Sequence, residues 1–161
     1  MKNQQLQTLI VTVQNKPGVL YKIAGLIRKR QFNIESLTVS HTEHAHTSRF
    51  TILVRGDETV IEKMSKQLFK IIEVLKISDP SESDIVAREL ALIKVSTAKK
   101  GSRQDITIIA RHFRARVINI RPDSMTLEIT GREDKIDSFH ENLRRFGIME
   151  FVRTGRTALM K

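Results

Sequence analysis

Residues 9–39 read LIVTVQNKPGVLYKIAGLIRKRQFNIESLTV, and this stretch decides the fold. Apolar and polar residues alternate with a period of two over residues 7–14, which predicts a strand with one apolar face. The tetrad NKPG at residues 15–18 then leads directly into residues 17–30, where apolar side chains recur at helical spacing. A strand, a tight turn and an amphipathic helix in direct succession predict the beginning of a mixed α/β unit.

The elements that follow complete this unit. Two strands are predicted over residues 33–42 and 48–55, followed by a helix over about 57–70 and a strand over 72–78. The resulting order is β-α-β-β-α-β. This order predicts a ferredoxin-like arrangement, a four-stranded antiparallel sheet with both helices on one face.

The same order of elements recurs after a linker. The run DPSESD that begins at Asp79 contains Pro, Ser and acidic residues but no apolar residue. We therefore predict an α+β protein with two βαββαβ domains, at residues 1–79 and 85–161, joined by a linker at 80–84. The elements predicted in the second domain are strands at 88–97, 115–121, 124–130 and 148–154, and helices at about 103–113 and 132–146.

An alignment of the two halves at a shift of 75 residues supports the repeat. In this alignment, however, the corner at residues 99–103 (KKGSR) has nothing like the NKPG tetrad, and a capping box of Ser102 and Asp105 is predicted there instead. A turn needed only for folding should have a twin, so the asymmetry favours a functional tetrad. The matched pairs are Thr51/Thr126, Ile52/Leu127, Val54/Ile129, Gly56/Gly131, Ile61/Ile136, Leu68/Leu143 and Val74/Met149.

The tetrad has the chemistry of an anion-binding corner. Pro17 suits the first helical position, and Gly18 lets a ligand approach the backbone closely. The N–H groups of Gly18, Val19 and Leu20 would then lie free at the positive end of the helix, where a carboxylate or phosphate binds. Asn15 and Asn33 add neutral amides suited to a small apolar zwitterion. The alternative is that Asn15 caps the helix and the Pro-Gly pair only turns the chain.

Composition excludes several classes of protein. The chain has 161 residues, 40% hydrophobic and 29% charged, with no cysteine and no apolar run long enough to span a membrane. Disulfides and Cys-ligated zinc are therefore excluded. The first residues leave no room for a signal peptide, so a cytoplasmic location is expected. The net charge of +10 is spread over both halves and aromatics are 5%, which favours a solvated face or an acidic protein partner over nucleic acid.

No motif indicates catalysis. His41, His44 and His46 in the predicted hairpin could hold a metal, but no cysteine and only one acidic residue, Glu43, lie nearby, so an exposed hairpin tip without a metal is expected. The run at residues 99–103 lacks the spacing of a nucleotide-binding P-loop, and no Ser/His/Asp set can be assigned. The sequence therefore predicts a protein that is not an enzyme by itself.

The runs NKPGVLYKIAGLIRKRQFNIESLTVS, TSRFTI and GDETVIEKMSKQLFKIIEVLKI resemble the small regulatory subunit of acetolactate synthase (acetohydroxyacid synthase). The first half resembles its ACT domain, an amino-acid-sensing βαββαβ module. ELALIKV and TGREDKID in the second half resemble that family's second domain. The resemblance implies a non-catalytic subunit of a thiamine-diphosphate enzyme, which raises that enzyme's activity and confers feedback inhibition by valine, leucine or isoleucine.

The resemblance also implies an effector site and partners. The matching positions are Asn15, Gly18, Val19, Leu20, Asn33 and Ile34. In ACT dimers these groups face each other across a subunit interface, so one pocket draws on two chains. Thiamine diphosphate, Mg and FAD are expected on the catalytic large subunit, with no cofactor on this chain. A free-standing ACT sensor that regulates another enzyme or transcription is the alternative.

Overall fold

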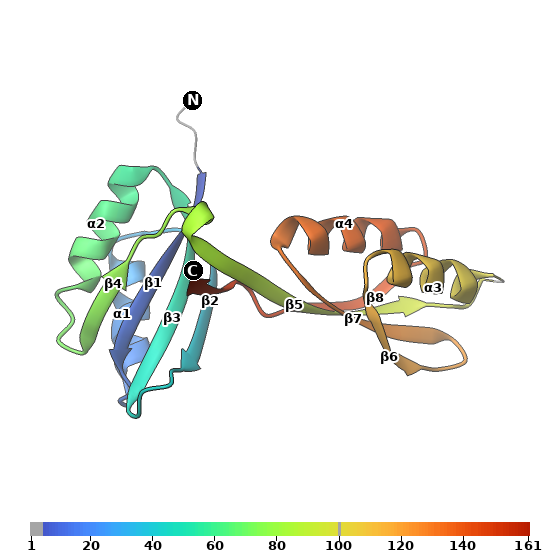
Figure 1. The fold of residues 1–161 in the computed structure, drawn as a ribbon, viewed down its shortest axis with the longest axis horizontal. Helices are drawn as coiled ribbons and strands as arrows, with labels where there is room; N and C mark the ends of the chain where they lie inside the picture. The colour runs from blue at the N-terminus through green and yellow to red at the C-terminus, as the bar shows by residue number, and fades with distance from the viewer. Residues whose placement is uncertain (1–4, 100) are drawn as a thin grey trace. The chain divides into compact units, whose positions relative to one another are not determined.

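The computed structural model describes residues 5–99 and 101–161, and the chain divides into two compact units. The first unit comprises residues up to Val86 together with Arg156–Lys161, and the second comprises Ala87–Gly155. Each unit contains an antiparallel sheet with two helices (Figure 1). The predicted fold class, two ferredoxin-like α+β units, is therefore confirmed.

In the first unit the sheet has the strand order β2-β3-β1-β4, so β2 and β4 are its edges. Alternate residues of the central strands β1 and β3 enter a core with α1 and α2, which lie on one face of the sheet (Figure 1). Leu9, Ile23 and Ile52 are completely buried in this core. The elements are β1 (Gln5–Gln14), α1 (Val19–Lys29), β2 (Ile34–His41), β3 (Thr47–Gly56), α2 (Glu58–Leu68) and β4 (Val74–Ser78).

The second unit repeats this plan with the strand order β6-β7-β5-β8. Ile93, Leu127 and Phe139 are completely buried in its core. A 3-10 turn, η1 (Glu82–Asp84), precedes it. Its elements are β5 (Ile85–Ser96), α3 (Ser102–His112), β6 (Arg116–Ile120), β7 (Ser124–Gly131), α4 (Glu133–Arg144) and β8 (Ile148–Arg153).

The last residues of the chain form a strand that was not predicted. β9 (Thr157–Met160) pairs with β5 and belongs to the first unit, although the sequence assigned residues 85–161 to a single second domain. The chain therefore passes from the first unit into the second near Val86 and returns after Gly155.

The two units do repeat one plan, but no single shift aligns them throughout. Gly56 and Gly131 confirm the shift of 75, because a Cβ on either would lie 2.8 or 2.6 Å from the side chain four residues later. Val74 and Met149 do not correspond: Val74 pairs with Val13 in the core, whereas Met149 is 55% exposed and Ile148 takes the equivalent place. The shift falls to 74 here because Val74 follows Leu68 by six residues, whereas Ile148 follows Leu143 by five.

Candidate functional site

Gly18 sits at the corner between β1 and α1 in a conformation that favours glycine. It is the N-cap of α1 with φ 86° and ψ −10°, in the left-handed region. A Cβ built on Gly18 would meet nothing within 4 Å. Packing within the chain therefore leaves the surface beside Gly18 open, and only the backbone conformation disfavours a side chain there.

The positive end of α1 is partly free to bind an anion. The helix begins at Val19, so Pro17 lies before the N-cap and not at the predicted first helical position. The Val19 N–H donates to the Lys16 carbonyl at 3.3 Å, so it is not free as predicted. In the described part of the chain, the Gly18 and Leu20 N–H groups have no acceptor, and the first turn of α1 carries no acidic residue.

Asn15 does not cap the helix, which removes that alternative. α1 has no side-chain cap, and the Asn15 amide nitrogen lies 3.4 Å from Nδ1 of His41. The Asn15 backbone N–H donates to the His46 carbonyl at 2.7 Å. These contacts join the corner to the β2–β3 hairpin, and a hollow of about 380 Å³ lined partly by Asn15 and His46 lies between them.

The histidine hairpin provides contacts to the corner. His41, His44 and His46 are exposed. Among residues 5–99 and 101–161 there is no group of three side chains able to hold a metal ion. The contact between His41 and Asn15 was missed by sequence reasoning, because the two residues are 26 positions apart and no periodic pattern links them.

A carboxylate also lies near the corner. Glu73 precedes β4, and its carbonyl accepts the Gln14 N–H at 2.8 Å. Lys22 of α1 donates to Oε1 of Glu73, and this hydrogen bond holds the pKa of Glu73 below its usual value. Oε2 of Glu73 is buried and has no hydrogen-bond partner in the described residues. The ion pair fixes the first turns of α1 to the end of β1.

Asn33 and Ile34 lie at the other end of the sheet from Asn15. Ile34 pairs with Val54, which pairs with Gln7, whereas Asn15 directly follows the last residue of β1, Gln14. Seven residues of strand separate these levels, about 23 Å at 3.3 Å per residue. One chain therefore brings together Asn15, Gly18, Val19 and Leu20, but not Asn33 and Ile34.

The corner of the second unit corrects the argument from asymmetry. Gly101 is the N-cap of α3 with φ 84° and ψ −17°, nearly the values of Gly18, and a Cβ on it would also meet nothing within 4 Å. The predicted capping box is wrong, because no side chain caps α3. At the shift of 83 residues that aligns these glycines, Ala98 stands opposite Asn15 and Arg116 opposite Asn33. The amides, and not the glycine, distinguish the first corner from the second.

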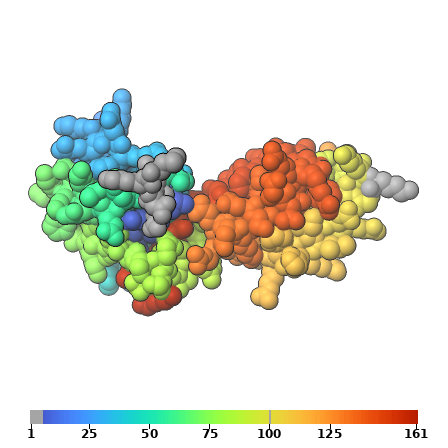
Figure 2. Space-filling model, turned by 90° about the horizontal axis from the view of Figure 1, so that it is seen from above, coloured from blue at the N-terminus to red at the C-terminus, as the bar shows by residue number. Residues whose placement is uncertain are grey.

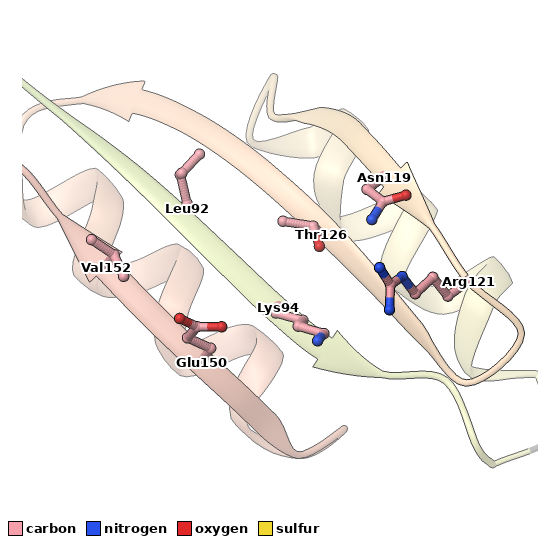
Figure 3. Close-up of a pocket in the computed structure, with 7 residues that line it drawn as sticks. All are labelled: Leu92, Lys94, Asn119, Arg121, Thr126, Glu150 and Val152. Carbon is pink, nitrogen blue, oxygen red and sulfur yellow. The ribbon is translucent and has the colours of Figure 1, made fainter.

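The second unit has a hollow of its own, on the sheet face turned away from α3 and α4 (Figure 3). Its volume is about 270 Å³. Strand register places Asn119, Thr126, Lys94 and Glu150 in one row across four strands. Leu92, Val152 and Arg121 complete the lining. The charged groups lie on an open sheet face, which suits contact with a polar surface.

Comparison with known proteins identifies the family. Residues 9–76 match the family described as the AHAS small subunit-like ACT domain, and residues 88–161 match the one described as the small subunit of acetolactate synthase. A probable acetolactate synthase small subunit of Archaeoglobus fulgidus is 48% identical over 96% of both chains. The chain belongs to the acetolactate synthase small-subunit family.

Further relatives agree with this assignment. The acetolactate synthase small subunit of Bacillus subtilis is 46% identical over 95% of this chain and 89% of its own. The crystal structure of the acetolactate synthase small subunit from Thermotoga maritima superposes with a TM-score of 0.89 at 36% identity, covering 98% of each chain. Small subunits of this synthase imply a large partner subunit. Within the described residues, no helix is long and apolar enough to cross a membrane.

Proposed function

We propose that this acetolactate synthase small subunit activates the catalytic large subunit and confers feedback inhibition by valine-type amino acids. The effector binds at an interface between two ACT domains. The observation that carries the proposal is the placement of Asn15 and Asn33 at opposite ends of one sheet. A pocket that uses both amides needs a second copy of the chain.

The edge strand β2 supports this assembly. His41 at the end of β2 contacts Asn15, and Ile34 begins the same strand. When two copies of β2 lie side by side in antiparallel orientation about a two-fold axis, the end of one meets the beginning of the other. Asn15 of one chain then faces Asn33 of its partner, and two equivalent pockets form.

Exposed apolar side chains on α1 and β2 are available to such an interface. Leu20, Tyr21 and Val39 are 49%, 82% and 44% exposed. Gly25 lies in the middle of α1, where glycine costs about 1 kcal/mol relative to alanine, and a Cβ on it would meet nothing within 4 Å in this chain. A close approach of another chain would explain this glycine.

The corner suits a small amino acid. The Gly18 and Leu20 N–H groups would bind the carboxylate at the positive end of α1. Asn15 and the partner's Asn33 would bind the remaining polar atoms, and the side chains of Leu20 and Ile34 would contact the apolar group. Val19 shapes the corner without a direct bond to the effector, because its side chain is buried in the core and its N–H donates to the Lys16 carbonyl. Thiamine diphosphate, Mg and FAD would belong to the large subunit, and the whole assembly would act in the cytoplasm.

A subunit-mixing experiment tests the two-chain pocket. Titration calorimetry of the full chain should detect valine, and Asn15→Ala and Asn33→Ala should each abolish binding. Mixing the two variants with subunit exchange should restore about one quarter of the sites, because each heterodimer has one intact pocket. If wild type binds but the mixture regains nothing, the two-chain pocket is refuted. Failure of wild type to bind valine, leucine and isoleucine, or to co-purify with the large subunit, would refute the proposed function.

A further inference from the structure

The end of the chain forms a small structure on the first unit, which we call the C-terminal strap (Arg156–Lys161). β9 within it pairs with β5, and the Lys161 N–H donates to the Asp84 carbonyl at 2.9 Å. The Ala158 side chain is 2% exposed. In Figure 2 the red C-terminal residues lie beside the yellow-green segment that precedes β5. The strap is therefore docked, with both backbone and side-chain contacts.

Arg156 holds the strap to the sheet. Its side chain is only 11% exposed. The guanidinium donates to the Thr8 hydroxyl at 2.7 Å and to the carboxylate of Glu82, and the Thr8 hydroxyl donates to the same carboxylate at 3.2 Å. Thr8 is 1% exposed and belongs to the central strand β1. Loss of Arg156 would leave the Thr8 hydroxyl and the Glu82 carboxylate with fewer partners.

Apolar residues are also buried on the face of the first sheet that is turned away from α1 and α2. Ile10 and Leu53 point away from the helices, yet they are only 4% and 2% exposed and lie outside the helix-side core. Ile85 at the start of β5 and Ala158 of the strap are likewise buried outside both cores. A sheet face that lay open to water would expose such residues. The strap therefore belongs to the covered face of the sensor sheet.

The strap also reaches the strand that begins at the proposed effector site. The Arg156 backbone N–H lies 3.5 Å from the Ser36 hydroxyl oxygen. Ser36 lies two residues after Ile34 in β2, and the pairing of β2 with β3 is irregular between these two positions. Such an irregularity interrupts the ladder of backbone hydrogen bonds at the start of β2.

We propose that Arg156 is a positioning residue that couples the effector site to the second unit through the strap. The inference rests on the proposed function. Effector bound at Asn33 and Ile34 fixes the irregular start of β2, and thereby Ser36, so that the docked strap is favoured. The chain joins its two units at only two places, and the strap is attached to one of them. Docking or release of the strap therefore changes how the second unit is tethered.

The small number of contacts made by the strap suits an equilibrium between docked and released states. A six-residue segment with one four-residue strand has few contacts to lose, so it belongs to the low-stability end of the fold. A ligand shifts such an equilibrium by its difference in affinity for the docked and released states, and the coupling is reciprocal. The factor by which valine stabilises the docked strap must equal the factor by which loss of docking weakens valine binding.

Hydrogen exchange of the full chain with and without valine tests the proposal. In wild type, saturating valine should slow exchange in the peptide covering residues 156–161 at least about fivefold. Arg156→Ala should make exchange there fast and insensitive to valine, and should weaken valine binding by the same factor. Thr157→Ala is the matched control in the same strand, because its side chain is exposed, and it should behave as wild type.

Holoenzyme assays provide the functional readout. Arg156→Ala should retain activation of the large subunit but require more valine for inhibition, and Arg156→Lys should recover part of the response. If valine binds to wild type but leaves exchange of the strap unchanged, the coupling role is wrong while the proposed function stands. This comparison uses only wild type, so it holds even if Arg156→Ala does not fold. If valine does not bind to wild type, the proposed function itself fails.

Discussion

Replacing Gly18 by alanine should separate ligand binding from backbone strain, because Gly101 is a natural control. The two glycines have nearly the same φ and ψ, occupy the same position before a helix, and have no atom within 4 Å of a built Cβ. Each alanine variant should therefore lose only the cost of a left-handed L-residue, about 1–2 kcal/mol. For a chain of this size that lowers the melting temperature by roughly 2–8 °C.

Only the Gly18 variant should lose the valine response. Its Cβ would occupy the open surface where the carboxylate is proposed to approach, so valine affinity should fall at least about tenfold, which is 1.4 kcal/mol. Gly18→Asn gives a second test, because asparagine tolerates the left-handed region better than alanine and fills the same space. It should retain more stability than Gly18→Ala but still lose binding.

Differential scanning calorimetry and valine titration of the three variants would measure both effects. Equal losses of stability in the two alanine variants, with valine affinity reduced only by changes at Gly18, would support the reasoning. Wild-type affinity in Gly18→Asn would refute it, because a ligand carboxylate cannot share that space with a side chain.

Three further predictions concern stability. Arg153→Ala leaves the Glu89 carboxylate, which is 4% exposed, without its main partner, so the free energy of unfolding of the second unit should fall by about 3–5 kcal/mol in denaturant unfolding. Replacing Glu89 by leucine in the same variant should recover part of this loss, and no recovery would contradict the buried-charge explanation. Burial, and then Glu58, raise the pKa of Asp79, so the folded chain binds this proton more tightly than the unfolded chain and the ionised group costs stability. Asp79→Asn should therefore raise the free energy of unfolding at pH 7, by a small amount because the group is largely exposed. The gain should disappear below pH about 3.9, the ordinary Asp pKa, and an undiminished gain at pH 3 would contradict this. Gly56→Ala should lower the melting temperature more than Gly131→Ala. The Cβ added at position 56 lies 2.8 Å from Cβ of Val60, which cannot move away, whereas the Cβ added at position 131 lies 2.6 Å from Cδ of the flexible Lys135 side chain. Equal losses would show that the backbone relaxes at both sites.

Most of the secondary structure could be predicted because it depends on local periodicity. Alternation in β1 and helical spacing in α1 were read correctly, and these faces form the core. The predictions failed where tertiary context decides. Gly101 was not recognised as the twin of Gly18, because Gly56 follows Gly18 by 38 residues whereas Gly131 follows Gly101 by only 30. The strands β6 and β7 and the turn between them are all shorter than β2, β3 and their turn, so the shift changes from 83 to 75 within the repeat.

The sequence proposed the residues of the candidate site but could not give their geometry. The NKPG tetrad pointed to Asn15 and Gly18, the next strand offered Asn33 as a second amide, and the wider resemblance added Ile34. The sequence could not show that Asn15 and Asn33 lie at opposite ends of the sheet, because that follows from the parallel directions of β1 and β2 on either side of β3.

The sequence by itself determined the order of elements, the apolar faces and the family, since each depends on residues close together in the chain. Only the tertiary structure decided where the last six residues belong. Arg156 in this segment contacts Thr8, Ser36 and Glu82, which lie 148, 120 and 74 positions away in the sequence. No local pattern encodes such contacts, because they exist only after the sheet has formed and the chain has returned to it.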